Sequence, residues 1–119
     1  MASTRKYDLN ERLIDYAVMI IALVKQLPSD RVGNHLGGQL LRSGTSPSLN
    51  YGEAQAAESK KDFVHKLKLS LKELRESYNC LKIIERSNTL DDCDNAIKET
   101  NELIAIFVKS INTTNERNK

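Results

Sequence analysis

The sequence predicts an all-α protein, folded as a single antiparallel up-and-down four-helix bundle over residues 1–119. Apolar residues recur every three or four positions over four long segments, which is the period of one face of a helix. Only five glycines and two prolines occur, too few for the many tight turns of a β-sandwich. Apolar residues make up 39% of the chain and charged residues 29%, so we expect one globular domain and not a disordered segment.

The first predicted helix covers residues 8–27. Its buried face repeats at intervals of three and four residues: Leu9, Leu13, Ala17, Ile20, Val24 and Leu27. Asp8 or Asn10 can cap its start, and Pro28 marks its end. A second apolar set widens this face: Ile14, Val18 and Ile21. Because a helix in a monomeric bundle needs a narrower apolar stripe, the excess indicates self-association.

The second predicted helix covers residues 30–57 and has unusual interior residues. Gly44 and Pro47 both oppose helix formation, by roughly 1 and 3 kcal/mol relative to alanine. The helix either ends near Ser43 or continues to about Ala57 with a kink at Pro47. Helical spacing resumes after the proline without a further strong breaker, so we favour the kinked continuation.

Two further helices complete the bundle, over residues 60–86 and 91–112. Ser59 and Asp62 have the spacing of a capping arrangement at the start of the third helix. The apolar row of this helix is the most regular in the sequence: Phe63, Leu67, Leu71, Leu74, Tyr78, Leu81 and Ile84. The polar residues 112–119 are expected to fray. Short connections between long helices make sequential neighbours antiparallel.

A bundle of this kind can hold a di-iron centre, which needs two Glu-x-x-His motifs and two further carboxylates. The nearest approach is Asp62-x-x-His65, followed by Glu73-x-x-Glu76, and His35 stands alone. The sequence therefore predicts no metal site and no cofactor, and these charges are expected on a solvated face.

No other enzyme site is predicted. Cys80 and Cys93 form no Cys-x-x-Cys pair and have no zinc-site spacing, and no glycine-rich phosphate loop is present. The longest apolar run, residues 17–24, is too short to span a bilayer, and no secretory signal is visible. We therefore expect a non-enzymatic, cytoplasmic protein with reduced thiols and no membrane partner.

Charge is unevenly distributed along the chain, although the net charge is only +2. Between Lys60 and Arg86 there are eight cations and four acids. Five of these cations are candidates for nucleic-acid contacts on the third helix: Lys60, Lys61, Lys68, Lys72 and Arg75. Their ligands would be phosphate groups, with binding that weakens steeply as salt is added. The alternative is an ordinary solvated face, supported by helical pairs such as Lys72–Glu76.

A second group of polar residues shares one face of the second helix. Together with a glutamate from the facing helix, it is a candidate structural network inside the bundle: Arg42, Ser46, Asn50, Glu53 and Glu76. Paired polar groups inside a bundle would fix the register of its helices. A catalytic role is disfavoured because no nucleophile with a matched base accompanies them.

One further pattern combines residues from both of these helices: Leu41-Arg42, Ser46-x-x-x-Asn50-x-x-Glu53, Phe63, and the run from Ser70 to Tyr78. This pattern resembles the four-helix bundle family named after proteins encoded in intervening sequences of 23S ribosomal RNA. The resemblance extends over about residues 8–111. The chain departs from the family pattern at Pro47-Ser48 and at Gly52-Glu53-Ala54.

The resemblance implies a homopentameric ring of bundles, in agreement with the wide apolar face of the first helix. Members of the family have been labelled ribosomal, and most have no established activity. A related protein, the accessory variability determinant of diversity-generating retroelements, is a basic pentamer that binds nucleic acid and a reverse transcriptase. This chain is much less basic.

We therefore expect a homo-oligomer, a pentamer by resemblance, that binds RNA, DNA or a nucleic-acid-associated protein through its basic face. The first alternative is a purely structural protein–protein interaction oligomer without nucleic-acid binding. A metal-binding bundle is the least favoured possibility.

Overall fold

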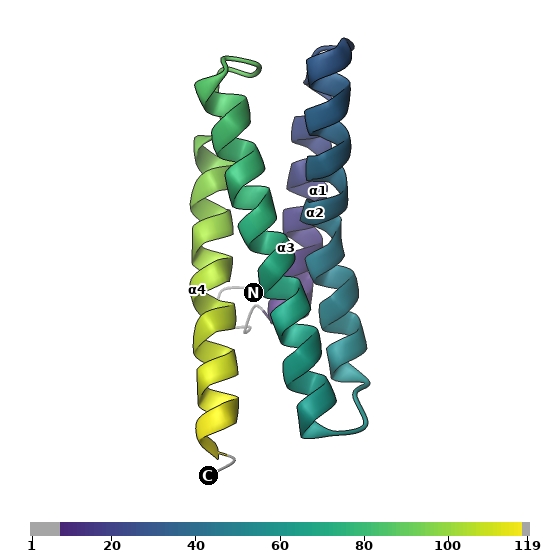
Figure 1. Cartoon of the computed structure of the whole chain (residues 1–119), viewed down its shortest axis with the longest axis vertical. Helices are drawn as coiled ribbons and strands as arrows, with labels where there is room; N and C mark the ends of the chain where they lie inside the picture. Colours follow the sequence, from purple (N-terminus) through teal and green to yellow (C-terminus); the bar gives the residue numbers. More distant parts are fainter. Residues whose placement is uncertain (1–7, 118–119) are drawn as a thin grey trace, which may run out of the picture.

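The computed structural model describes residues 8–117 and contains four long helices. These are α1 (Leu9–Val24), α2 (Arg31–Gln55), α3 (Lys60–Arg86) and α4 (Asp94–Arg117). Figure 1 shows them side by side, joined by short connections at alternate ends of the bundle. No strand occurs within residues 8–117, so the predicted all-α class is confirmed. In the same range, no helix combines the length and the apolar character that crossing a membrane would require.

Three helices begin at capping side chains. The Asp8 carboxylate accepts a hydrogen bond from the Glu11 amide at 2.8 Å, and the Asp30 carboxylate accepts one from Gly33 at the same distance. The Ser59 hydroxyl accepts from the Asp62 amide at 3.0 Å, as the sequence predicts. These bonds satisfy backbone donors that have no partner within their own helix.

Helix α3 has the predicted bounds, whereas the ends of the other three helices differ from the predicted ones by one to five residues. Helix α1 ends at Val24, and the next three residues form a tighter turn in which the Leu27 amide donates to the Val24 carbonyl at 3.1 Å. The expectation that residues 112–119 fray is wrong as far as Arg117, because α4 continues to that residue. No glycine or proline follows Ile111, and polar residues without a breaker can extend a helix that is already anchored by packing. Residues 118 and 119 lie outside the described range.

Helix α2 passes through Pro47 without ending. It is continuous from Arg31 to Gln55, which agrees with the favoured continuation, while the kink stays a prediction. Pro47 is buried, and its carbonyl oxygen accepts a hydrogen bond from the Ser70 hydroxyl of α3 at 3.1 Å. The Ser43 hydroxyl, one turn earlier in α2, accepts from Ser77 of α3 at 2.8 Å. As α2 advances, its partners in α3 come earlier in the chain, so these two helices are antiparallel.

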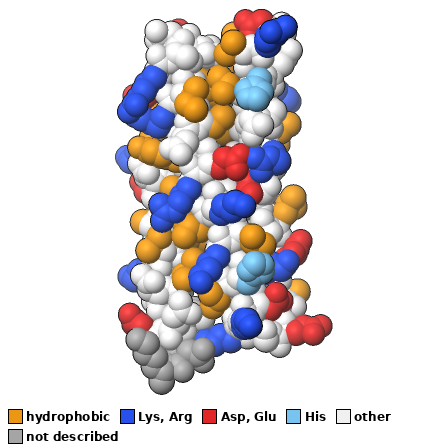
Figure 2. Space-filling model, in the orientation of Figure 1, with side chains coloured by type: hydrophobic (Ala, Val, Ile, Leu, Met, Phe, Trp, Pro, Cys, Tyr) orange, Lys and Arg blue, Asp and Glu red, His pale blue; other side chains and the backbone are white. Residues whose placement is uncertain are grey.

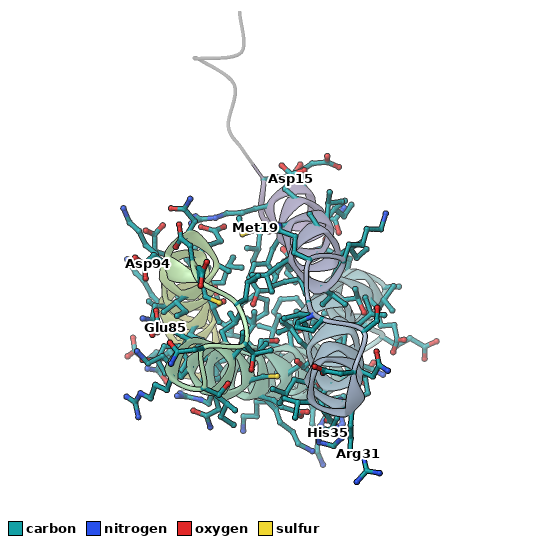
Figure 3. The ribbon with its side chains drawn as sticks, turned by 90° about the horizontal axis from the view of Figure 1, so that it is seen from above. Asp15, Met19, Arg31, His35, Glu85 and Asp94 are labelled. Atoms are coloured by element: carbon teal, nitrogen blue, oxygen red, sulfur yellow. The ribbon has the colours of Figure 1, made fainter. Side chains whose placement is uncertain are left out.

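The core is a column of large side chains between the four helices (Figure 3). Its fully buried members come from every helix: Leu13, Tyr16, Ile20, Leu40, Leu67, Leu74, Leu81, Ile84, Leu103 and Phe107. Burial of this apolar surface is the main source of stability in such a bundle, at about 25 cal/mol per Å².

One layer of this core is polar and receives one hydroxyl group from each helix. The Tyr16 and Thr100 oxygens lie 2.7 Å apart, and Ser77 donates to Ser43. Thr100 uses its only proton on the Ala96 carbonyl at 2.6 Å, so the Tyr16 hydroxyl must donate to Thr100. No buried side-chain oxygen or nitrogen in residues 8–117 lacks a partner. Sliding one helix along its axis would break these hydrogen bonds, so the layer favours a single register of the helices relative to one another.

Candidate nucleic-acid interface

The cations predicted to contact nucleic acid lie exposed along α3. This set, here called the α3 basic row, also includes a residue that the sequence analysis did not select; its members are Lys60, Lys61, Lys68, Lys72, Arg75 and Arg86. None of them forms an ion pair with another residue of the described part of the chain. In Figure 2, lysine and arginine side chains follow one another down the face that α3 shares with α2. The structure therefore presents unpaired positive charges along one helix.

The row remains unpaired because another helix takes up two acids of α3. Arg42 of α2 donates to the Glu73 carboxylate at 2.9 Å and also contacts the Glu76 carboxylate. The Glu76 charge, followed by that of Glu73, raises the pKa of Arg42. The helical pair Lys72–Glu76 considered from the sequence is absent from the ion pairs of residues 8–117. Arg42 thus binds Glu76, the acid of α3 that lies at helical pairing distance from Lys72.

The other two acids of α3 also have defined neighbours. Glu85 accepts from Lys82 at 3.3 Å on the same helix. Asp62 is half-buried, and its charge helps to raise the pKa of Lys66, although the main cause of that rise is the hydrogen bond to Glu53. Lys66 and Lys82 are therefore paired cations and are not members of the α3 basic row.

A pocket of about 440 Å³ lies where the start of α3 passes the end of α4. Its lining consists of Lys60, Lys61, Val64, His65, Lys68 and Asn115. Three of these side chains belong to the α3 basic row, and no carboxylate contributes to the lining. The pocket is not predictable from the sequence, because Asn115 lies in the polar segment that is expected to fray.

The predicted polar network has a different location from the expected one. The structure brings Arg42 and Glu76 together, but at the surface, where 50% of the Arg42 side chain is exposed. Ser46 donates to the backbone carbonyl of Arg42 at 2.7 Å, and Glu53 pairs with Lys66 at 2.6 Å. Asn50 is half-buried and joins none of these contacts. The polar side chains buried inside the described part of the bundle are instead Tyr16, Ser43, Ser70, Ser77 and Thr100.

Potential metal ligands do not converge. No group of three or more histidine, cysteine, aspartate or glutamate side chains within residues 8–117 could hold a metal ion. Figure 3 shows His35 at the outer edge of α2, away from Glu85 and Asp94 on the opposite side of the bundle. Asp62 and His65 of α3 are joined by no third potential ligand from the part of the chain that the structure describes.

Both cysteines are buried, free thiols. Cys80 donates to the Leu36 carbonyl at 3.6 Å, and burial, reinforced by the Glu76 charge, raises its pKa to about 11. Burial also raises the pKa of Cys93. A nucleophilic cysteine requires the opposite shift, toward the thiolate.

A second surface feature lies on the outside of α1 and α2. Val18 is 59% exposed and Leu49 is 68% exposed, and Ile14 and Leu41 are also exposed. Gly44 of α2 lies directly against Ile20 of α1. Because these helices are antiparallel, the level of Ile14 in α1 corresponds to that of Leu49 in α2. We call this set the α1/α2 apolar face: Ile14, Val18, Ile21, Leu41 and Leu49. The sequence analysis identified only the contribution of α1.

Comparisons with known proteins identify a matching family and a similar solved structure. A family model described as 23S rRNA-intervening sequence protein matches residues 5–109. A crystal structure from Bacteroides thetaiotaomicron, described as a protein with unknown function from the S23 ribosomal protein family, is 28% identical in sequence. The superposition has a TM-score of 0.82 and covers 87% of this chain and 98% of that chain. Among curated proteins, none matches.

Proposed function

The chain belongs to the 23S rRNA-intervening sequence protein family, and from that premise we propose that it is a non-enzymatic, homo-oligomeric bundle that binds RNA through the α3 basic row. The observation that carries the proposal is the set of exposed cations on one helix that have no carboxylate partner within residues 8–117. Unpaired cations can exchange solvent ions for phosphates without first breaking a protein ion pair.

The arrangement of the row favours a polymeric ligand over a small anion. From Lys61 to Arg86 the row extends about 37 Å, at 1.5 Å per helical residue. Lys68, Lys72 and Arg75 follow one another at helical intervals of four and three residues. A polynucleotide carries one negative charge per nucleotide and can contact such a row at several points. No aromatic side chain belongs to the row, so the contacts would be with the backbone and would read little sequence.

Self-association would strengthen this binding. The α1/α2 apolar face leaves large side chains in water, and a second copy of the chain is the occupant that we propose for it. The face lies on different helices from the α3 basic row, so the two surfaces share no side chain. In a ring, several weak phosphate contacts would act together through avidity. We propose the pentamer that the family resemblance implies, located in the cytoplasm, where the two free thiols would remain reduced.

A pair of matched variants tests RNA binding. Lys68→Gln/Lys72→Gln/Arg75→Gln removes three cations of the row, and Arg31→Gln/Lys98→Gln/Lys109→Gln removes three exposed cations of other helices. The net charge and the types of substitution are the same in both. By fluorescence anisotropy at low salt, the first variant should lose at least about tenfold in RNA affinity and the second much less. Equal losses, or no detectable binding by the wild type, would contradict the proposal.

The second candidate function is a structural oligomer whose only partners are proteins. The exposed apolar side chains Val18 and Leu49 favour it, since they indicate a protein contact independently of any charge. Assembly without measurable RNA affinity at low salt would support this alternative.

A further inference from the structure

We infer that the pocket between the start of α3 and the end of α4 binds the terminal phosphate monoester of an RNA strand. This inference rests on the proposed RNA binding and adds to it a fixed position for one end of the strand. The ligand chemistry follows from the lining, which combines cationic and neutral donors without any carboxylate.

The lining concentrates donors more densely than any other part of the α3 basic row. Lys60, Lys61 and Lys68 supply ammonium groups, and His65 supplies a ring nitrogen between them in sequence. Asn115 adds an amide from α4, so the donors approach from two helices. The four charged or titratable side chains are unpaired with any acid of the described chain. The nearest acid in sequence, Asp62, does not line the pocket.

A terminal phosphate suits this pocket better than an internal one. A phosphate monoester carries about −1.5 to −2 charges at neutral pH and offers three strong acceptor oxygens. An internal diester carries only one negative charge, which single cations such as Lys72 and Arg75 can neutralise. The volume of about 440 Å³ lies within the usual range for small-ligand pockets, so a phosphate and its attached sugar would fit.

The position of the pocket also agrees with a strand end. Lys68 belongs both to the lining and to the row, so a strand anchored in the pocket can continue along α3 toward Arg86. The pocket marks the beginning of the row, since α3 itself begins at Lys60.

The first test compares three otherwise identical short RNAs with a 5′-phosphate, a 3′-phosphate or hydroxyl groups at both ends. At least one phosphorylated RNA should bind about tenfold more tightly than the hydroxyl form, which is the effect of one good charge-assisted contact. Lys60→Gln/His65→Gln should abolish this difference. Lys72→Gln/Arg75→Gln should weaken all three RNAs by the same factor and preserve the difference. If all three RNAs bind the wild type equally, this inference fails while the proposed RNA binding stands.

The second test does not need RNA. Inorganic phosphate is titrated into the protein while backbone amide resonances are followed by NMR, with chloride at equal ionic strength as the control. Phosphate-specific shifts should cluster at Lys60, Lys61, His65, Lys68 and Asn115. Shifts distributed over all exposed lysines, or none beyond those caused by chloride, would overturn the inference. If the shifts cluster there but no RNA binds, the pocket is a site for free phosphate, and both the proposed RNA binding and its extension to an RNA end are contradicted.

Discussion

At the scale of single residues, the side chain that most affects the α3 basic row lies on another helix. Arg42 is half exposed and binds Glu73 and Glu76, one turn of α3 apart. Glu76 lies four residues after Lys72, at the spacing of a helical ion pair, so Arg42 competes with Lys72 for this carboxylate. The positive surface of α3 thus depends on a contact between two helices.

Replacing Arg42 tests this dependence. Arg42→Gln releases Glu76, which can then pair with Lys72 four residues earlier on α3, and RNA affinity should fall by about twofold, the effect of one helical ion pair. Arg31→Gln is the matched control, because it removes the same charge from an exposed, unpaired position of the same helix. Equal effects of the two variants in an anisotropy titration would show that Arg42 acts only through its own charge.

The buried thiol of Cys80 makes stability depend on pH in the alkaline range. Its pKa is about 11 in the folded protein, while in the unfolded chain it ionises near its ordinary value of about 8.5. Between these values the unfolded state binds fewer protons than the folded state, so the free energy of unfolding should fall as pH rises from about 9 to about 11.

Cys80→Ser removes this titration and keeps a hydroxyl group for the Leu36 carbonyl. The urea midpoint of the variant should therefore decline less between pH 8.5 and pH 10.5 (about 2 pH units, the window set by the two pKa values) than that of the wild type. Parallel declines in the two proteins would show that Cys80 contributes nothing to the alkaline loss.

At the scale of elements, the contact between α1 and α2 depends on small residues of α2. A Cβ atom added at Gly44 would lie 2.6 Å from Cγ2 of Ile20, which is itself fully buried and stiff because it is β-branched. A Cβ atom added at Gly38 would meet nothing within 4 Å. The same substitution should therefore have opposite effects at two positions of one helix.

Gly44→Ala should lower the free energy of unfolding by about 1–3 kcal/mol, the usual range for overpacking a core. Gly38→Ala should raise it by about 0.5–1 kcal/mol, since alanine is the better helix former and no clash opposes it. Urea denaturation of both variants measures the difference. A stabilised Gly44→Ala protein would mean that α1 can move away from α2 at little cost.

The four helices could be predicted from the sequence because the spacing of apolar residues directly reflects which side chains are buried. Phe63 to Ile84 is the clearest example, and α3 has the predicted bounds. The end of α4 could not be predicted in this way, because its last turn is polar and has no apolar periodicity. This turn is helical because it extends a helix that packing already anchors. The rotation of each helix about its own axis could not be predicted either. The sequence therefore did not reveal that Arg42 would reach Glu73 as well as Glu76.

The hydroxyl layer was missed for a related reason. Serine and threonine occur at buried and exposed helix positions alike, and only the packing of all four helices identifies Ser43, Ser77 and Thr100 as buried. The basic residues were easier to identify, since exposed lysines need no partner to fix their location. What the sequence could not show is that no carboxylate in the described chain pairs with the members of the α3 basic row.

At the scale of the whole molecule, two surfaces are assigned to two roles. The α1/α2 apolar face is assigned to self-association, and the α3 basic row is assigned to RNA. Because they lie on different helices, a substitution in the α3 basic row can weaken RNA binding without changing the assembly.

Val18→Asp/Leu49→Asp should convert the oligomer to a smaller species, because each change places a charge in a contact that would exclude water. Sedimentation velocity measures the mass, and Ile83→Asp, at an exposed apolar position of α3, is the control. An unchanged mass in the double variant would assign self-association to another surface. RNA affinity should also fall in the double variant, through the loss of avidity.

The most direct test of the central claim is the salt dependence of RNA binding. For a single-stranded RNA of about ten nucleotides, the logarithm of the association constant should fall linearly with the logarithm of the salt concentration, with a slope of about −3.5 to −4 for five or six phosphate contacts. Lys68→Gln/Lys72→Gln/Arg75→Gln should reduce the slope by about 2 units, whereas Arg31→Gln/Lys98→Gln/Lys109→Gln should leave it unchanged. A slope near zero in the wild type, or the same reduction in both variants, would contradict the assignment of RNA binding to α3.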